Sequence, residues 1–473
     1  MGEHTKRNSL PPTRRSARTS FLPRFSVRGL RRVCLAVLTS VIVAATARAD
    51  DWPQWLGPQR DGVWREIGSL DKFPAGGPKV RWRVKVGAGY AGPAVAGDRV
   101  YLTDRVLAEG ATNHKEPFPQ RPAKSIPGTE RILCLSDRDG SLLWKYEYDC
   151  PYTISYPVGP RTTPLVRDGK VYTLGAEGNL ICLDTAEGKL IWERDLKKDY
   201  KIKAPLWGVS AHPLLDGRKL ICLVGGAGTT AVAFDKDTGK ELWRALTAKE
   251  PGYAPPMIYE FGGQRQLIVW HAEAVNGLDP ETGKVYWTQP ATSYMGMSIA
   301  TPRQEGDTLF VTAHPSLALL LRPKSGAAPE VVWRGEKKTG FCSVFSTPFA
   351  EDGYLYGVHT GGALCCVKAA TGERQWQTFE PTTGGRPAGS AECFLVKNGD
   401  RFFVFNEKGD LIIARLTPKG YKEVSRTHLL DPTSAAFGRM VLWSHPAFAH
   451  RSAYMRNDKE LLCVSLAADG KEK

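Results

Sequence analysis

Short apolar runs alternate with turn residues along most of the chain. Residues 163–192 show the pattern best, because four such runs are separated by turns at Gly169, Gly178 and Gly188. Short runs rich in β-branched and aromatic residues, with a turn signal about every 8–12 residues, indicate antiparallel strands. Long helical periods are hard to find. The pattern therefore predicts an all-β chain.

The same four-run unit recurs at intervals of about 40 to 50 residues, a period typical of β-propeller blades. Copies end at Trp82, Trp144, Trp192, Trp243, Trp287, Trp333 and Trp376, and Val424 marks the weakest copy. One longer interval holds a polar, Pro-rich insertion at about residues 105–130. Eight copies predict one eight-bladed propeller domain over residues 78–473.

The two ends of the chain complete one blade between them. The last copy, from Pro446 to about Leu466, has only three runs, and the alternating stretch 80–86 around Trp82 supplies a fourth. Pairing of these N- and C-terminal strands closes the ring and removes exposed sheet edges. We therefore expect eight four-stranded antiparallel blades. Residues 50–77 form a lead-in whose Trp52, Trp55 and Trp64 are expected to pack on the ring.

The junction between the last two runs of a unit carries a motif, best seen as Ala-x-Asp-x-x-Thr-Gly-Lys-x-x-Trp at Ala233–Trp243. Asp235 can accept hydrogen bonds from backbone N–H groups of the turn, and Gly239 can adopt the positive φ that the reversal needs. Trp243 offers a flat apolar surface for a neighbouring layer. Looser copies lie at 279–287, 184–192 and 371–376.

This motif, repeated in register, resembles the tryptophan-docking motif of the PQQ-like repeat family of eight-bladed propellers. That family includes quinoprotein alcohol dehydrogenases and the outer-membrane assembly factor BamB. The resemblance implies that the tryptophans dock blade on blade, with or without a quinone. Two functions follow: a non-catalytic exported scaffold that binds a ligand or a protein, or a PQQ- and calcium-dependent oxidoreductase of the alcohol or sugar dehydrogenase type. We expect the scaffold, without a cofactor, and leave the enzyme as the alternative.

Adjacent cysteines at Cys365 and Cys366 resemble the vicinal disulfide near the quinone of such dehydrogenases. The repeat favours a different interpretation. Cys134, Cys182, Cys366 and Cys463 occupy one position of the unit, where other copies have Ala233 or Gly277. A free cysteine behaves as a small apolar residue, so we expect a packing position.

Histidines and aromatic residues gather in segments that should open on one face of the ring. His212 and His445 precede first strands, whereas His271, His314 and His359 follow second strands. The loops that lead to the same face carry Arg161, Trp207, Tyr253 and Trp443. We hypothesise that this face binds a metal, a small ligand or a partner; the alternative is a set of solvated loop histidines. No metal-binding histidine spacing is found, and no residue stands out as catalytic.

Residues 1–49 predict a secretory signal peptide, with a basic head, the apolar run Val33–Thr46 and the exit Ala47-Arg48-Ala49. An uncleaved membrane anchor is the alternative. Ten of the 64 Lys and Arg residues lie here, so cleavage would remove most of the net charge of +15. We therefore expect a periplasmic or extracellular monomer without a membrane span. Its partner would be an envelope protein or a small ligand at the channel mouth, not a nucleic acid.

Overall fold

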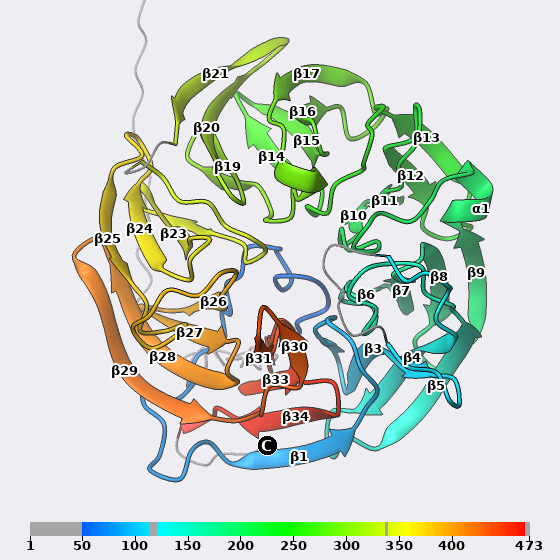
Figure 1. Cartoon of the computed structure of the whole chain (residues 1–473), viewed down its shortest axis with the longest axis vertical. Helices are drawn as coiled ribbons and strands as arrows, with labels where there is room; N and C mark the ends of the chain where they lie inside the picture. The colour runs from blue at the N-terminus through cyan, green and yellow to red at the C-terminus, as the bar shows by residue number, and fades with distance from the viewer. Residues whose placement is uncertain (1–49, 114–120, 336–338, 469–473) are drawn as a thin grey trace, which may run out of the picture. The chain divides into compact units, whose positions relative to one another are not determined.

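The computed structural model describes residues 50–113, 121–335 and 339–468, and the predicted signal peptide lies outside them. The described residues contain 34 strands, one short helix, α1 (Leu196–Tyr200), and one 3-10 turn, η1 (Tyr294–Gly296). Eight antiparallel four-stranded sheets form the blades of a propeller (Figure 1). The all-β, eight-bladed prediction is confirmed. None of the helices in the described part of the chain has the length and apolar character needed to cross a membrane.

Each blade takes four successive strands, except the last. Blade 1 contains β2 (Ala94–Ala96), β3 (Arg99–Leu107), β4 (Gly128–Ser136) and β5 (Leu142–Asp149). Blade 2 contains β6 (Leu165–Arg167), β7 (Lys170–Leu174), β8 (Asn179–Asp184) and β9 (Leu190–Asp195). Blade 3 contains β10 (Leu214–Asp216), β11 (Lys219–Leu223), β12 (Ala231–Asp235) and β13 (Glu241–Ala245). Blade 4 contains β14 (Met257–Phe261), β15 (Gln264–Trp270), β16 (Ala274–Leu278) and β17 (Val285–Pro290).

The second half of the ring repeats this order. Blade 5 contains β18 (Arg303–Glu305), β19 (Thr308–Ala313), β20 (Leu317–Lys324) and β21 (Ala327–Arg334). Blade 6 contains β22 (Phe349–Glu351), β23 (Tyr354–Val358), β24 (Leu364–Lys368) and β25 (Arg374–Thr378). Blade 7 contains β26 (Cys393–Asn398), β27 (Arg401–Asn406), β28 (Asp410–Thr417) and β29 (Gly420–His428). Blade 8 contains β32 (Ala447–Ala449), β33 (Ser452–Arg456), β34 (Glu460–Ser465) and β1 (Val80–Lys85).

The ring closes as expected, by pairing of the two chain ends. In Figure 1 the blue strand β1 lies beside the red strand β34. The two strands pair antiparallel, with Trp82 opposite Cys463 and Val84 opposite Leu461. An additional hairpin, β30 (Ser434–Ala436) with β31 (Arg439–Val441), lies between blades 7 and 8 and was not predicted.

Tryptophan docking is visible atom by atom between blades 2 and 3. Trp192 donates a hydrogen bond from Nε1 to the carbonyl oxygen of Lys236 in the next blade, at 3.0 Å. Its ring lies against Gly239, so that a Cβ added there would come within 2.7 Å of the indole. Gly239 also has φ +68°, which favours glycine. In the same turn, Asp235 accepts from the N–H groups of Asp237 and Thr238 at 3.1 and 2.9 Å.

The same contact joins most neighbouring blades. The indole N–H donates to a backbone carbonyl oxygen of the next blade at 2.7 to 3.0 Å in four further pairs: Trp82 with Asp137, Trp144 with Thr185, Trp333 with Ala369, and Trp376 with Thr417. Trp243 lies against Gly283 of the next blade, at 2.6 Å from an added Cβ. The contact therefore explains the glycine of five of these turns, Gly140, Gly188, Gly239, Gly283 and Gly372, whereas Gly420 in the turn beside Trp376 has no atom within 4 Å of an added Cβ.

Trp287 is an exception. Its Nε1 donates to Gln266 Oε1 at 2.7 Å, within blade 4, and its ring fills the space beside Gly277 of the same blade. The neighbouring β20–β21 hairpin has eight residues in each strand and turns only between Lys324 and Ala327. No aspartate lies in the turn of this hairpin, and the indole packs on its own blade.

The assignment of Val424 to the docking position is wrong. In β29 the residue opposite Ile413 is Ser425, and Val424 is the bulged residue beside it. The absence of a tryptophan at this position follows from the way the ring closes. Blade 8 has no turn between its third and fourth strands, because these are β34 and β1 from opposite chain ends. The lead-in covers the position instead, and the backbone N–H of Phe73 donates to Ser425 Oγ at 3.0 Å.

The cysteine position is confirmed as a packing position. Four cysteines pair directly with docking tryptophans across the strands: Cys134 with Trp144, Cys182 with Trp192, Cys366 with Trp376, and Cys463 with Trp82. All four thiols are buried and free, and so is that of Cys365. The small side chain leaves room for the indole on the opposite strand.

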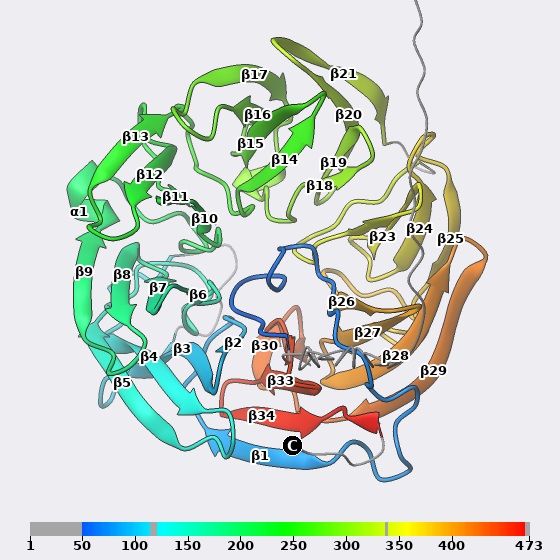
Figure 2. The same ribbon diagram turned by 180° about the vertical axis from the view of Figure 1, so that it is seen from behind.

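The lead-in crosses the centre of the ring, as the dark blue segment of Figure 2 shows. Trp52, Trp55 and Trp64 are buried. Arg60 is also buried and donates to the carbonyl oxygens of Pro213 at 2.9 Å and Pro256 at 3.4 Å, so the lead-in is tied to blades 3 and 4. Burial lowers the pKa of Arg60 to about 10.

The predicted insertion is shorter than its expected range of about 105–130. Strand β3 continues to Leu107 and β4 begins at Gly128, so both ends of the range belong to the sheet. Between them, Arg121 donates to the carbonyl oxygens of Thr153 at 3.1 Å and Ala204 at 2.8 Å.

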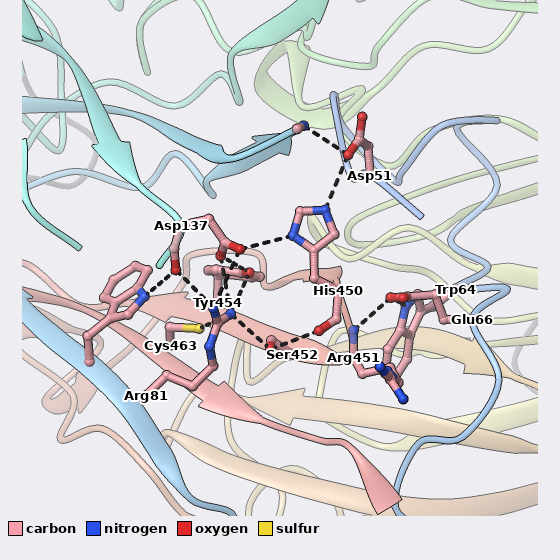
Figure 3. A network of polar contacts seen from close by, with 12 residues as sticks. Asp51, Trp64, Glu66, Arg81, Asp137, His450, Arg451, Ser452, Tyr454 and Cys463 are labelled. Atoms are coloured by element: carbon pink, nitrogen blue, oxygen red, sulfur yellow. Dashed lines mark hydrogen bonds and ion pairs between the residues drawn. The ribbon is translucent and has the colours of Figure 1, made fainter. Parts of the chain in front are cut away.

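A polar network holds the closing seam (Figure 3). His450 contacts Asp137 of blade 1 at 3.1 Å and Asp51 of the lead-in at 3.3 Å. Asp137 also pairs with Arg81 of β1 at 3.2 Å and accepts from the Tyr454 hydroxyl. Burial alone would lower the pKa of His450, but the two carboxylates raise it to about 9.

We predict that replacing Gly239 with Ala costs about 2–4 kcal/mol of unfolding free energy, because the methyl group meets the Trp192 ring and the backbone is left-handed. Gly217→Ala is the matched control in the same blade: φ is +59° but no atom lies within 4 Å of the added Cβ, so about 1 kcal/mol is expected. Denaturant unfolding measures both. Equal losses would contradict the docking explanation.

The seam predicts a pH dependence of stability. The folded pKa of His450 lies above its ordinary 6.5, so its stabilisation is complete below pH 6.5 and is lost as the pH rises through about 9. His450→Gln should therefore lose about 1–3 kcal/mol at pH 6 and much less at pH 10. Urea unfolding at a series of pH values measures this difference. A difference that does not change with pH would show that the ion pair is not responsible.

Candidate functional site

A cavity of about 490 Å³, the mouth pocket, lies where the loops before the first strands of all eight blades meet. Its lining is mostly aromatic and apolar, with a few hydroxyl and imidazole groups: Trp55, Tyr90, Tyr156, Arg161, Trp207, Ser210, His212, Tyr253, Pro255, Tyr294, Met297, Ile299, His314, Val344, Phe345, Thr360, Gly389, Ser390, Phe437, Trp443 and His445. Volumes of about 300–1,000 Å³ are usual for small-molecule sites.

Seven of the nine residues singled out in the sequence line this pocket: Arg161, Trp207, His212, Tyr253, His314, Trp443 and His445. The other two do not. His271 contacts Glu273 at 3.0 Å, and His359 Nδ1 accepts from the backbone N–H of Cys342 at 3.0 Å. These two histidines serve local loop structure.

Sequence reasoning missed much of the aromatic lining. Tyr90 and Phe345 each lie a few residues before the first strand of a blade, so the repeat could have predicted that they lie at this face. Trp55 comes from the lead-in and Phe437 from the β30–β31 hairpin. Neither segment follows the repeat, so no local signal in the sequence indicates that these two residues lie at the channel.

The floor of the pocket is an indole between two imidazoles. Trp55 stacks on His212, with ring centres 3.9 Å apart and planes at 13°, and meets His445 edge-on at 4.0 Å. The N–H of Thr163 donates to His212 Nδ1 at 2.9 Å, so the neutral His212 ring carries its proton on Nε2. Burial lowers the pKa of His212 and of His445 well below the usual range. The floor is therefore uncharged near neutral pH.

Arg161 is held in the pocket wall by hydrogen bonds to backbone carbonyl oxygens. Its guanidinium donates to the carbonyl oxygens of Trp207 at 2.9 Å, Ser155 at 3.1 Å and Tyr156 at 2.6 Å, and also to that of Gly159. These bonds tie the loop before β6 to the loop before β10. Four of the five N–H donors of the planar fork that usually binds a carboxylate are engaged by backbone groups.

A buried ion pair holds the opposite wall. Arg439 of β31 donates to both oxygens of Glu407 at 2.8 and 3.0 Å, and Trp443 Nε1 donates to the same carboxylate at 3.3 Å. Trp443 packs edge-on against Phe345, with ring centres 5.0 Å apart. Phe437, at the tip of the hairpin, completes this wall.

A second buried carboxyl group lies behind the same wall. Glu392 is 1% exposed, and its Oε1 accepts from the backbone N–H of Phe345 at 3.4 Å. Burial raises the pKa of Glu392 to about 8, and the nearby Glu407 acts in the same direction. Glu392 and Glu407 can therefore lie close together, because Glu392 is protonated at neutral pH.

Some of the strained backbone of the described residues lies at the pocket. Three lining residues other than glycine have left-handed φ values: Tyr156 at +51°, Ser390 at +55° and Phe437 at +48°. Met295, beside the lining residue Tyr294, has φ +51°. Such conformations cost on the order of 1–3 kcal/mol each and cluster at ligand sites. The strained backbone places side chains at the rim of the pocket.

The lining offers few kinds of polar or charged group. In the part of the chain that the structure describes, Arg161 is the one charged side chain of the lining near neutral pH, and the lining contains no Asp, Glu or Asn. The described residues also contain no group of three or more His, Cys, Asp or Glu side chains arranged to hold a metal ion. The lining is therefore suited to an apolar ligand.

A family model described as outer membrane protein assembly factor BamB matches residues 128–378 and 271–472. The two overlapping matches span well over half of the chain. The chain belongs to this family. A search of curated proteins finds no match.

Solved structures similar to this BamB-family chain include a BamB protein and quinohemoprotein alcohol dehydrogenases. BamB from Moraxella catarrhalis has a TM-score of 0.50 and 15% identity, over 78% of this chain and 99% of that one. Quinohemoprotein alcohol dehydrogenases from Pseudomonas putida and Comamonas testosteroni both have a TM-score of 0.54 and 13% identity. These matches cover 89% and 91% of this chain, and 81% and 82% of the others. At such identities the likeness shows the fold alone.

We predict that Glu392→Gln makes stability less sensitive to pH. The folded pKa of about 8 exceeds the ordinary 4.5, so the wild type loses stability as the pH rises from 4.5 through 8. The variant should match the wild type near pH 4.5 and exceed it by about 2–4 kcal/mol at pH 9. Urea unfolding at both pH values measures this. Glu407→Gln, which breaks the Arg439 pair, is the control and should lose stability at both; a Glu392→Gln variant that does the same contradicts the assignment.

Proposed function

We propose that this BamB-family propeller is a non-catalytic scaffold that binds a ligand, or a segment of another protein, in the mouth pocket. The observation that carries the proposal is the aromatic, almost uncharged lining at the meeting point of eight loops. The repeat fixes the blades, whereas these loops vary in length and carry some of the strained residues. Binding sites are commonly placed in this way, on loops held by a rigid scaffold.

The residues of the pocket do not fit PQQ with Ca²⁺, the alternative that the resemblance implied. Ca²⁺ takes about six to eight oxygen ligands, largely from carboxylates and amide carbonyls. The described lining offers no such side chain, and the fork of Arg161 is bound to backbone carbonyl oxygens. Cys365 and Cys366 belong to β24 inside the blade core and do not line the pocket. These observations support a scaffold without a quinone.

The place of action is part of the same proposal. The BamB family and the signal peptide predicted at residues 1–49 support an exported protein, periplasmic or extracellular, that acts as a monomer on envelope partners. The mouth pocket is the surface that we assign to such a partner or to its ligand.

A titration with PQQ and Ca²⁺ tests the proposal. We expect the tryptophan fluorescence of the purified protein to show no saturable change, although Trp55, Trp207 and Trp443 all line the pocket and would report a bound quinone. A known quinoprotein dehydrogenase stripped of PQQ serves as the positive control. Saturable quenching near one-to-one stoichiometry, together with alcohol-dependent dye reduction, would overturn the scaffold and favour the oxidoreductase.

A further inference from the structure

We infer that the mouth pocket selects an uncharged, largely apolar ligand group that contains a flat ring, and that it discriminates against negatively charged analogues of the same shape. The inference rests on the proposed function, because it names the class of ligand that the scaffold binds. It is carried by three properties of the pocket: flat aromatic walls, the absence of an available partner for a negative charge in the described lining, and a closed floor.

The walls present ring faces and edges from opposite sides. On one side Trp207 packs against Tyr253, with ring centres 5.8 Å apart. On the other side Trp443 contacts Phe345 at 5.0 Å, Tyr156 at 6.1 Å and Phe437 at 6.3 Å. Aromatic side chains bind flat rings through stacked or edge-on contacts and bury a large area with few rotatable bonds. A flat ring system is therefore the group that these walls contact best.

The lining gives an anionic group no available partner. Its described residues include no carboxylate to pair with a cation, for which its aromatic faces are the available contact. The described lining offers an anionic ligand one guanidinium, that of Arg161, whose N–H groups donate to the carbonyl oxygens of Trp207, Ser155, Tyr156 and Gly159. Moving a charge from water into such a site is costly unless the charge is paired there.

The imidazoles of the pocket add no charge to its lining near neutral pH. Burial lowers the pKa of His212, His314 and His445, so all three rings are neutral near pH 7. They can exchange single hydrogen bonds with a polar atom of the ligand, as can the hydroxyl groups of Ser210 and Thr360 in the lining. A neutral ligand with one or two polar atoms is thus tolerated, whereas an anion finds no charged imidazole to pair with.

The floor limits the depth of the site. Trp55 of the lead-in closes the channel beneath the pocket and is itself fixed by stacking on His212 and by a 3.3 Å hydrogen bond to Thr301 Oγ1. The space above it, about 490 Å³, has room for a group of two or three fused or linked rings. At the rim, Tyr294 and Phe437 are 54% and 51% exposed, so they are placed to cover such a group.

Two dyes with the same ring skeleton provide the test. N-phenyl-1-naphthylamine is neutral, and 8-anilinonaphthalene-1-sulfonate is the same molecule with one added sulfonate. Both become fluorescent in an apolar site, so each can be titrated with the purified full-length protein near pH 7. We expect one saturable site for the neutral dye and at least about tenfold weaker binding of the sulfonate, because its charge stays unpaired.

Variants locate the bound dye. Trp207→Ala and Phe437→Ala, on opposite walls, should each weaken binding of the neutral dye by about tenfold. Leu190→Ala is the matched control, since Leu190 is an exposed apolar residue of β9 on the outer edge of blade 2 and should leave binding unchanged. Near-native unfolding transitions of all three variants would show that they are folded.

The outcomes separate the inference from the proposed function. If the sulfonate binds as tightly as the neutral dye, or more tightly, and the two wall variants weaken both dyes, the pocket binds ligands but the selection for an uncharged group is wrong. If neither dye binds, or the wall variants leave binding unchanged, the inference is wrong, whereas the proposed scaffold, which includes a protein segment as occupant, is decided by the titration with PQQ and Ca²⁺.

Discussion

The contact between an indole ring and a glycine of the next blade is the constraint on which the ring depends. Trp192 and Gly239 show why both partners are required: the indole occupies the volume of the missing Cβ, and its N–H satisfies a carbonyl oxygen of the same turn. The contact fixes distance and orientation together. Because it is made between successive blades, its repetition sets how each sheet is placed against the next.

The exceptions show what the contact depends on. Trp287 packs within its own blade, and Ser425 replaces tryptophan where the next blade has no turn. At this second place the lead-in supplies the missing packing through Phe73. The same lead-in provides Trp55 at the floor of the mouth pocket. Closure of the ring and construction of the pocket thus rely on one segment.

The blades could be predicted from the sequence because their signals are local. Each turn, its glycine and its tryptophan lie within about a dozen residues of one another, and the period repeats them. A bulge at Val424 shifts the pairing of β29 with β28, so that Ser425 takes the position of the tryptophan. The apolar pattern around Val424 does not reveal this shift. Likewise, the loops of His271 and His359 turn these rings toward Glu273 and Cys342, contacts that strand order alone does not determine.

The pocket is harder to read because its parts meet only in the closed ring. Trp55 and His445 are far apart in the chain, yet their rings touch, and Phe437 belongs to a hairpin outside the repeat. This separation has a functional consequence. The docking contacts lie toward the outer strands, whereas the eight loops at the channel carry none of them and are free to differ. A propeller of this family can therefore differ in those loops while every blade contact stays in place, which is why the proposal for what this chain binds rests on the lining and not on the repeat.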